Sequence, residues 1–217
     1  MQLLDHTRDS LLDYTGQQIK NFFPDTDLPA LRLQLARNLD QALARVAHCL
    51  GHVRMWPQDQ FNYLNSSQYC IYLYYLANTV WRNEQHAATA TRLFLLNKAL
   101  NGIDLFYEIA MPEVFFIGHS VGIVLAKATY GNYLVLYQNS TVGKNHGVAP
   151  VLGDGVIMYP NSAIIGRCQI GADTIVSQGC GIINRDTPGN CIAFPGQAGQ
   201  IVCKTPPRPL LDDFFRR

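Results

Sequence analysis

The residues best suited to chemistry in this sequence are His119 and Asp104, which lie fifteen positions apart. Transfer of an acyl group from a thioester to an alcohol needs a base that is partly unprotonated near neutral pH, and a carboxylate that orients and charges this base. Histidine is the side chain whose charge changes in that range. His119 is therefore a candidate general base, and Asp104 is its candidate partner.

A six-residue repeat in the second half of the chain supplies a scaffold for this pair. An aliphatic residue recurs at every sixth position, and a small or compact residue stands four places later. The aliphatic positions are Leu152, Met158, Ile164, Ile170, Val176 and Ile182, and the compact positions are Val156, Ser162, Cys168, Thr174 and Cys180. This pattern predicts a triangular prism, in which each hexapeptide is one short parallel strand and three hexapeptides close one coil.

The same frame extends upstream of this run. Its aliphatic positions there are Ile117, Ile123, Thr129 and Val135. Fifteen residues is just under one eighteen-residue coil, so we expect stacking of successive coils to bring Asp104 beside His119. His119 is the third residue of the hexapeptide IGHSVG, where a side chain can face outward toward a neighbouring prism.

Two segments interrupt the repeat. The frame slips across residues 141–151, TVGKNHGVAPV, which predicts a protruding loop in place of another side of the prism. Because polar loops that leave a rigid scaffold often carry binding groups, Gly143 and His146 are candidate acceptor-binding residues. After Ile183 we expect the chain to leave the prism and to end in a proline-rich tail, TPPRPLLDDFFRR.

The first half of the chain shows helical periodicity instead. Asp27 and Pro29 mark the start of a helix whose apolar residues recur at three- and four-residue steps until Gly51. Further helices are expected between Leu3 and Phe23, from Ser66 or Ser67 to Trp81, and from Glu84 to Leu100. The sequence thus predicts an α+β protein with a helical domain at 1–102, a β-helix at 103–202 and a tail at 203–217.

Composition narrows the class of partner. The 217 residues are 48% hydrophobic, and 17 Lys and Arg are balanced by 16 Asp and Glu, without the basic excess that is typical of nucleic-acid-binding surfaces. The amino terminus lacks the pattern of a signal peptide, and the apolar stretch from Cys70 to Trp81 is too short to span a bilayer. We therefore expect a cytoplasmic protein with a small-molecule partner, and neither nucleic acid nor membrane.

The six cysteines show no pair with the spacing of zinc ligands. In a cytoplasmic protein they are expected to stay reduced, and we interpret them as small apolar fillers of the core.

The residues around His119 resemble those of serine O-acetyltransferases. That family has an aspartate at the start of its first coil and, fifteen residues later, a histidine in a motif like DHATGIV. This chain has Asp104 and then GHSVGIV at 118–124. The family's later segments SVTLGG and GVPARIV are similar to Ser140–Lys144 and to FPGQAGQIV at 194–202. The resemblance implies a left-handed β-helix, a homotrimer or dimer of trimers, and acetyl-CoA in the groove between adjacent prisms.

Three departures from the family pattern concern recognition of the acceptor and of a protein partner. Gly118 stands where the family has an aspartate that helps to hold the serine amino group. The family's Arg-His pair falls near Val148 and Ala149, and His146 is displaced by three residues. The isoleucine that docks on cysteine synthase has no counterpart in the final FFRR. The resemblance thus implies an acetyl-CoA-dependent O-acetyltransferase whose acceptor need not be serine, with a sugar, a nucleotide sugar or a biosynthetic intermediate as alternatives.

Coenzyme A carries an amide-rich arm that can run along the edges of strands, so position in the coils selects its candidate contacts. These are Ser162, Ala163, Ser177 and Gly179, and Lys204 and Arg208 are candidates for the phosphates.

Two other classes of function stay open. One is a metal-dependent prism enzyme similar to γ-carbonic anhydrases, for which His119 and His146 lack a clear third ligand in the coils. The other is a trimeric scaffold without catalytic activity. We expect no metal site.

Overall fold

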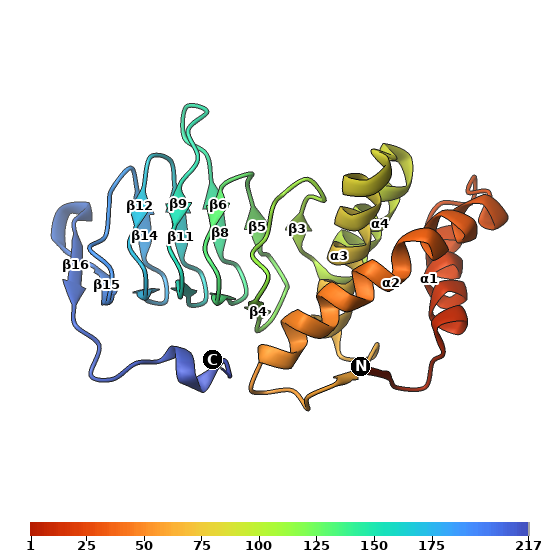
Figure 1. The fold of residues 1–217 in the computed structure, drawn as a ribbon. Coiled ribbons are helices and arrows are strands. Elements are labelled where there is room, and N and C mark those ends of the chain that lie inside the picture. Colours follow the sequence, from red (N-terminus) through yellow and green to blue (C-terminus); the bar gives the residue numbers. More distant parts are fainter. Residues whose placement is uncertain (217) are drawn as a thin grey trace.

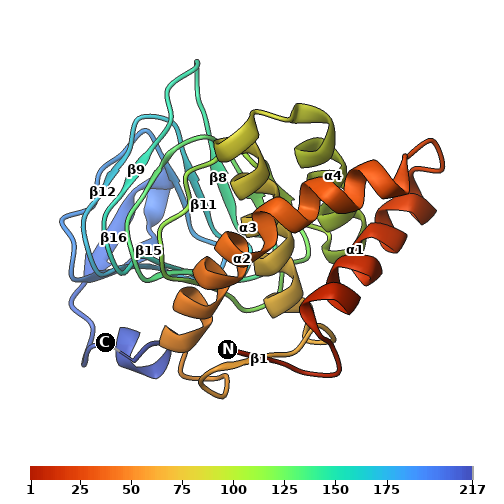
Figure 2. The same ribbon diagram turned by 45° about the vertical axis from the view of Figure 1, so that its right-hand side comes forward.

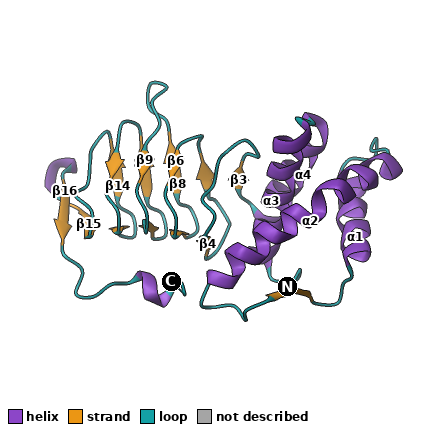
Figure 3. Ribbon diagram, viewed as in Figure 1, coloured by secondary structure: helices purple, strands orange, loops and turns teal. Residues whose placement is uncertain are grey.

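The computed structural model describes residues 1–216, without the side chain of Ala198, and places a helical half at one end of a stack of β coils (Figure 1). The helices are α1 (Arg8–Phe22), α2 (Leu28–His52), α3 (Ser66–Glu84) and α4 (Ala87–Asn101). Figure 3 shows that helices fill the first half and short strands the second. The α+β fold class and the parallel β-helix predicted from the repeat are confirmed, as is the left-handed form that the family resemblance implies.

Each helix begins at a capping side chain. Asp27 accepts a hydrogen bond from the N–H of Ala30, as the sequence predicts, and Thr7 forms a capping box at α1. The prediction for α3 was wrong by one or two residues, because Asn65 provides the cap. Glu84 ends α3 and does not start α4, since Gln85 adopts a left-handed conformation with φ of 52°.

Helix α3 forms the core of the helical half. Every residue from Ser67 to Val80 is buried, so the tyrosines of this segment pack inside the protein. The hydroxyl of Tyr74 donates to the carbonyl of Ile109, at 2.6 Å, so α3 is tied to the start of the β-helix. Figure 2 shows α2 and α3 running close together at that end.

The β-helix has three faces, each a sheet of stacked strands. Face I contains β4 (Phe115–Ile117), β7 (Leu134–Leu136), β10 (Ile157–Met158), β13 (Thr174–Val176), β15 (Cys191–Pro195) and β16 (Ile201–Lys204). Face II contains β3 (Asp104–Leu105), β5 (Val124–Leu125), β8 (Thr141–Gly143), β11 (Ala163–Ile165) and β14 (Gly181–Ile183). Face III contains β6 (Thr129–Tyr130), β9 (Val151–Leu152) and β12 (Gln169–Ile170), and β1 (Gln2–Leu3) pairs separately with β2 (Gln60–Phe61).

The downstream repeat is confirmed by the register of the strands. Leu152 pairs with Ile170, and Ile164 with Ile182, so each coil has eighteen residues. The aliphatic side chains from Leu152 to Ile182 in this frame are 0–3% exposed, and the compact positions are buried as well.

The upstream frame was wrong by one residue beyond Ile123. Tyr130 pairs with Leu152 and points inward, whereas Thr129 is exposed. Leu136, and not Val135, pairs with Met158. The cause is the unequal length of the sides, because Ile117 to Leu125 takes eight residues and Leu125 to Tyr130 takes five, which leaves a net shift of one residue.

The segment after Ile183 does not leave the prism as expected. Cys191–Pro195 returns to face I as β15 and pairs with β13 in parallel, and β16 then adds an antiparallel strand that ends the sheet. Of the six cysteines, Cys203 on β16 is exposed, so the interpretation as core filler is wrong for this one.

The tail runs back along face I to the helical half (Figure 1). Its buried Phe214 and Phe215 contact the rings of Phe116 and Tyr133, at centroid distances of 5.9 and 5.4 Å. Arg216 donates hydrogen bonds to four backbone carbonyls in the segment 51–56. The tail therefore covers outward-facing aliphatic residues of face I and ties the two halves together.

Within residues 1–216, none of the helices combines the length and the apolar character that crossing a membrane requires.

Candidate functional site

His119 lies in the turn between β4 and β5, at the corner where face I meets face II, and its side chain is exposed. The turn is anchored to the end of α4, because Ser120 Oγ donates to the carbonyl of Asn101 at 2.7 Å. Gly122 closes it with φ of 76°, in a place where a Cβ atom would lie 2.0 Å from Asn139 Oδ1. From Ile117 to Leu125 this corner takes eight residues, two more than a regular hexapeptide.

A cleft of about 480 Å³ lies beside His119, between the helical half and the first coils. The β-helix lines it with Phe116, Gly118, His119 and Tyr137, and the helical half with Met55, Trp56, Leu64, Asn65, Ser66 and Ser67. No acidic side chain is among these residues. The cleft thus presents a histidine, hydroxyls, an amide and apolar surface.

The surroundings of Gly118 explain why this position carries no carboxylate side chain. A Cβ atom at this position would lie 2.6 Å from two atoms of the Tyr137 ring, so no larger residue fits while that ring stays in place. The ring is held by Tyr159, which stacks on it at 5.6 Å, and by Phe214 of the tail at 6.3 Å. Burial raises the pKa of the Tyr137 hydroxyl. An aromatic wall therefore occupies the space that a side chain at 118 would need.

The sequence predicts that Asp104 lies beside His119, but in the structure its carboxylate has another partner. Its carboxylate forms an ion pair with Lys98, 2.6 Å from Nζ, and within residues 1–216 no hydrogen bond or ion pair joins it to His119. The longer first coil accounts for this difference. Asp104 pairs with Val124, five residues beyond His119, so the end of α4 lies level with the histidine instead.

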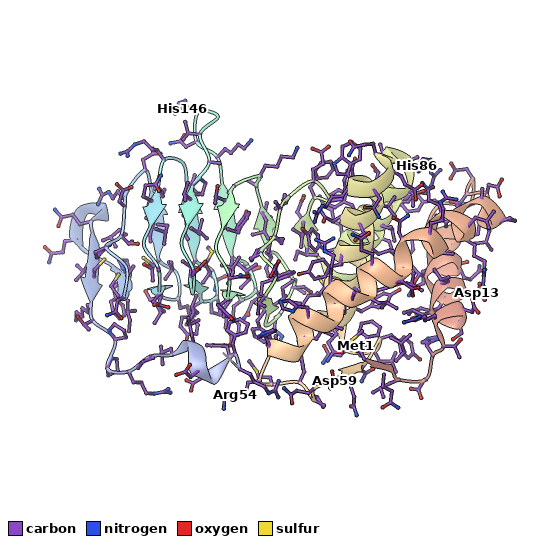
Figure 4. The ribbon with its side chains drawn as sticks, in the orientation of Figure 1. Met1, Asp13, Arg54, Asp59, His86 and His146 are labelled. Carbon is purple, nitrogen blue, oxygen red and sulfur yellow. The ribbon has the colours of Figure 1, made fainter. Side chains whose placement is uncertain are left out.

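His146 lies at the tip of the protruding loop, far from the helical half (Figure 4). The predicted loop at 141–151 was too long, because Thr141–Gly143 is strand β8 of face II and Val151 belongs to β9. The loop leaves the corner between faces II and III, whereas His119 is at the other edge of face II. Within one chain the two histidines therefore do not meet, and Gly143 lies on the face between them.

The candidate coenzyme A contacts fall into three environments. Ala163 lies on face II, and Ser177 and Gly179 lie in a turn on the same corner as His119. Ser162 is 1% exposed, its carbonyl accepts from the N–H of Thr141, and its place among the coenzyme A contacts stays a prediction.

Lys204 and Arg208 lie apart from these residues. Lys204 belongs to β16 at the end of face I, where its ammonium lies 5.7 Å from the centre of the Phe194 ring. Arg208 forms two hydrogen bonds with Asp213 in the tail, at 3.0 and 2.7 Å. Neither is brought to the His119 corner.

The outer surface of face II was missed by the repeat analysis, which considered inward positions. Residues next to the inward ones point outward, and on face II, beyond Asp104 of β3, these are small or aliphatic: Val124, Thr141, Gly143, Ala163, Ile165, Gly181 and Ile183. Val124 and Ile183 are 46% and 52% exposed. These outward residues alternate with the inward ones along each strand, and this period of two is a sequence signal that could have revealed the surface.

Among residues 1–216 of one chain, no three histidine, cysteine or acidic side chains are grouped as metal ligands would be.

A helical domain followed by a left-handed hexapeptide β-helix defines the structural class of this chain. Solved structures of this class to which it is similar are serine acetyltransferases. For the enzyme of Neisseria gonorrhoeae the TM-score is 0.71 at 17% identity, over 96% of this chain and 83% of that chain. For the Brucella abortus strain S19 enzyme in complex with coenzyme A it is 0.68 at 14% identity, over 93% and 84%.

A structure of the Neisseria gonorrhoeae enzyme in complex with serine gives a TM-score of 0.69 at 17% identity, over 91% of this chain and 84% of that chain. No family model matches the sequence. No curated protein matches it either. The similarity in structure establishes the fold.

Proposed function

We propose that this protein transfers an acetyl group from acetyl-CoA to a hydroxyl of a small molecule, with His119 as general base. The observation that carries the proposal is the position of His119, exposed in a lengthened turn beside a cleft of about 480 Å³. As the acceptor oxygen attacks the thioester carbonyl, His119 takes its proton and returns it to the departing thiolate of coenzyme A.

Face II supports the binding of a long, thin co-substrate. From β5 to β14 its outward residues include Gly143, Ala163 and Gly181, which leave this part of the surface low, and none of the outward residues of these strands is charged. The similar Brucella abortus enzyme binds coenzyme A. We propose that the arm of acetyl-CoA lies along this face, near Ala163, Ser177 and Gly179, and that its thioester reaches the His119 corner.

The site is proposed to be completed by a neighbouring subunit in a homotrimer. His119 and His146 lie at opposite edges of face II, so one chain does not bring them together. A threefold arrangement with face II against the next prism would place the loop of one subunit near the His119 corner of another. Light scattering should then give about three chain masses, and a fully active monomer would contradict this arrangement.

The acceptor is proposed to be a molecule other than serine. A similar enzyme is seen with serine, whose ammonium group calls for a carboxylate. The cleft beside His119 has no acidic side chain, and Tyr137 fills the space at Gly118. A neutral acceptor such as a sugar fits the hydroxyls and the amide of this cleft better than an amino acid does.

Asp104 stays a proposed partner of His119. The ion pair that holds it is partly exposed, with Lys98 and Asp104 side chains 50% and 35% accessible. Exposed ion pairs contribute about 0–1 kcal/mol, so little would oppose a turn of the carboxylate toward the imidazole when substrates bind.

The proposal is tested by incubating the purified chain with acetyl-CoA and a panel of hydroxyl compounds, while free thiol is measured. We expect thiol release that depends on one acceptor and on His119, with serine a poor substrate. His119→Ala should remove the release and leave the melting temperature unchanged. The absence of thiol release with every acceptor, or full activity of His119→Ala, would contradict it.

A further inference from the structure

A second cleft, also of about 480 Å³, opens on the helical half, away from the residues that line the His119 cleft. It lies between α2, which contributes Arg45 and His48, and α3, which contributes Tyr75 and Arg82. The segment 111–113 closes its third side. Its volume is in the range of pockets that bind small organic molecules.

Arg45 is partly buried in this cleft without a carboxylate partner. Its guanidinium lies 4.4 Å from the centre of the Tyr75 ring, and Nη1 donates to Thr79 Oγ1 at 2.9 Å. Among the described residues it makes no ion pair. Burial lowers the pKa of Arg45, because the charged form loses water contacts.

Five arginines in residues 1–216 form ion pairs, and Arg45 is not among them. Those with a carboxylate within 4.0 Å are Arg8, Arg32, Arg37, Arg92 and Arg208. Arg8, Arg37 and Arg208 lie on the surface, where water screens the charge, and the half-buried Arg32 and Arg92 have carboxylate partners. Arg45 is half-buried as well but has no carboxylate partner, and a charge taken from water without a partner is costly.

Arg82 adds a second positive charge to the same cleft. It is exposed, has no ion pair within the described residues, and lies close enough to lower the pKa of Arg45. The acidic residue at the rim is Glu113, which is 81% exposed and 3.7 Å from His48. The cleft thus carries at least as much positive as negative charge, and the buried positive charge is the unpaired one.

We propose that this cleft binds a small organic oxyanion, a carboxylate or a phosphate ester, through the guanidinium groups of Arg45 and Arg82. Guanidinium groups bind both kinds of oxyanion with two parallel hydrogen bonds. Met111 and Pro112 supply an apolar wall for the carbon part of the ligand. The proposal does not rest on acetyl transfer and holds whether or not that activity is found.

The test is calorimetric titration of the full-length protein with inorganic phosphate and, separately, with succinate, at constant ionic strength. We expect saturable binding of at least one probe, and the probe that binds identifies the ligand as a phosphate ester or a carboxylate. Arg82→Gln should weaken binding at least tenfold, and Arg45→Gln should abolish it.

Arg185→Gln is the matched control, because Arg185 is an exposed arginine of the β-helix without an ion pair in residues 1–216. It should bind both probes as the wild type does. The absence of saturable binding, equal binding by Arg82→Gln and wild type, or equal weakening in Arg185→Gln would overturn the proposal. Should Arg45→Gln fail to fold, the exposed Arg82→Gln decides the question.

Discussion

The last coils of this β-helix keep the eighteen-residue repeat, whereas the first coil departs from it. From Leu152 to Ile183 each coil has eighteen residues, and its inward side chains are almost fully buried. The coil from Leu105 to Leu125 has twenty, and the corner before Leu125 is extended and carries His119. The regular coils have the features of a scaffold, whereas the irregular coil exposes a histidine beside a cleft. Departures from the repeat therefore mark where function is to be sought.

The largest expected effect is on catalysis at the irregular corner. His119→Ala should lower kcat by about 10²–10⁴-fold, because it removes the proposed general base, while the exposed position leaves stability unchanged. Steady-state kinetics and thermal melting measure the two quantities. Val121→Ala is the control, since Val121 is 65% exposed in the same turn and should keep wild-type kcat. A folded His119→Ala with more than about a tenth of the activity would remove this histidine from the mechanism.

In the regular coils the expected effect is on stability. Ile164 is fully buried between Val142 and Ile182, so Ile164→Ala should cost about 2–5 kcal/mol in the free energy of unfolding. Val202→Ala should change it by less than about 0.5 kcal/mol, because Val202 is 42% exposed on β16. Urea unfolding measures both. Similar losses for the two variants would mean that burial of the inward side chains does not set the stability of these coils.

Variants at position 118 test whether the Tyr137 ring excludes a side chain from this part of the cleft. Gly118→Ala should destabilise the protein by about 1–3 kcal/mol, because its Cβ would overlap the Tyr137 ring. In a Tyr137→Ala background the same change should cost much less. Unfolding of the two single variants and the double variant gives this coupling. Additive losses would show that Tyr137 does not exclude a side chain at 118.

Variants of Asp104 and Lys98 test whether the carboxylate of Asp104 turns toward His119 when substrates bind. Asp104→Asn should lower kcat about tenfold if the carboxylate orients His119, and Lys98→Ala should leave kcat unchanged or raise it. The double variant Asp104→Asn, His119→Ala should be hardly worse than His119→Ala. Equal and small effects of Asp104→Asn and Lys98→Ala would assign Asp104 to the observed ion pair alone.

The sequence predicts the regular parts of this molecule well, because each inward position there is set by one physical requirement, burial of an aliphatic side chain. The helices were predicted for the same reason, from apolar residues at helical spacing and from caps such as Asp27. The prediction is wrong where coil length changes. The His119 corner has two residues more than the repeat, and the side from Leu125 to Tyr130 has one fewer. The frame therefore shifts by one residue, and Thr129 and Val135 are assigned to the wrong side.

The sequence predicts the contacts of the candidate site less well. The position of His119 on an exposed corner follows from the motif, but its pairing with Asp104 depended on a coil of eighteen residues. The wall formed by Tyr137 depends on Phe214, which lies 77 positions later and reaches face I through the tail. No local pattern links two residues so far apart, so this part of the site needed the structure.

The smallest expected effect concerns the helical half, where polar side chains join α2 to the end of α3. Glu84 accepts hydrogen bonds from Arg37, Asn38 and Gln34, and these lower its pKa to about 2, with Arg37 the main cause. A carboxyl whose folded pKa is depressed stabilises the fold above its unfolded pKa, and this contribution is lost as pH falls toward the folded value. Glu84 should therefore stabilise at neutral pH and progressively less between about 4.5 and about 2.

Glu84→Gln measures this contribution. At pH 6 it should lower the free energy of unfolding by about 1 kcal/mol, the usual net value of such hydrogen bonds, and the difference from wild type should shrink at pH 3. Asp40→Asn is the control, because Asp40 is 75% exposed and its ion pair with Arg8 lies on the surface, so its effect should be small at both pH values. If the difference for Glu84→Gln stays the same at pH 6 and pH 3, the network acts through its shape and not through the charge of Glu84.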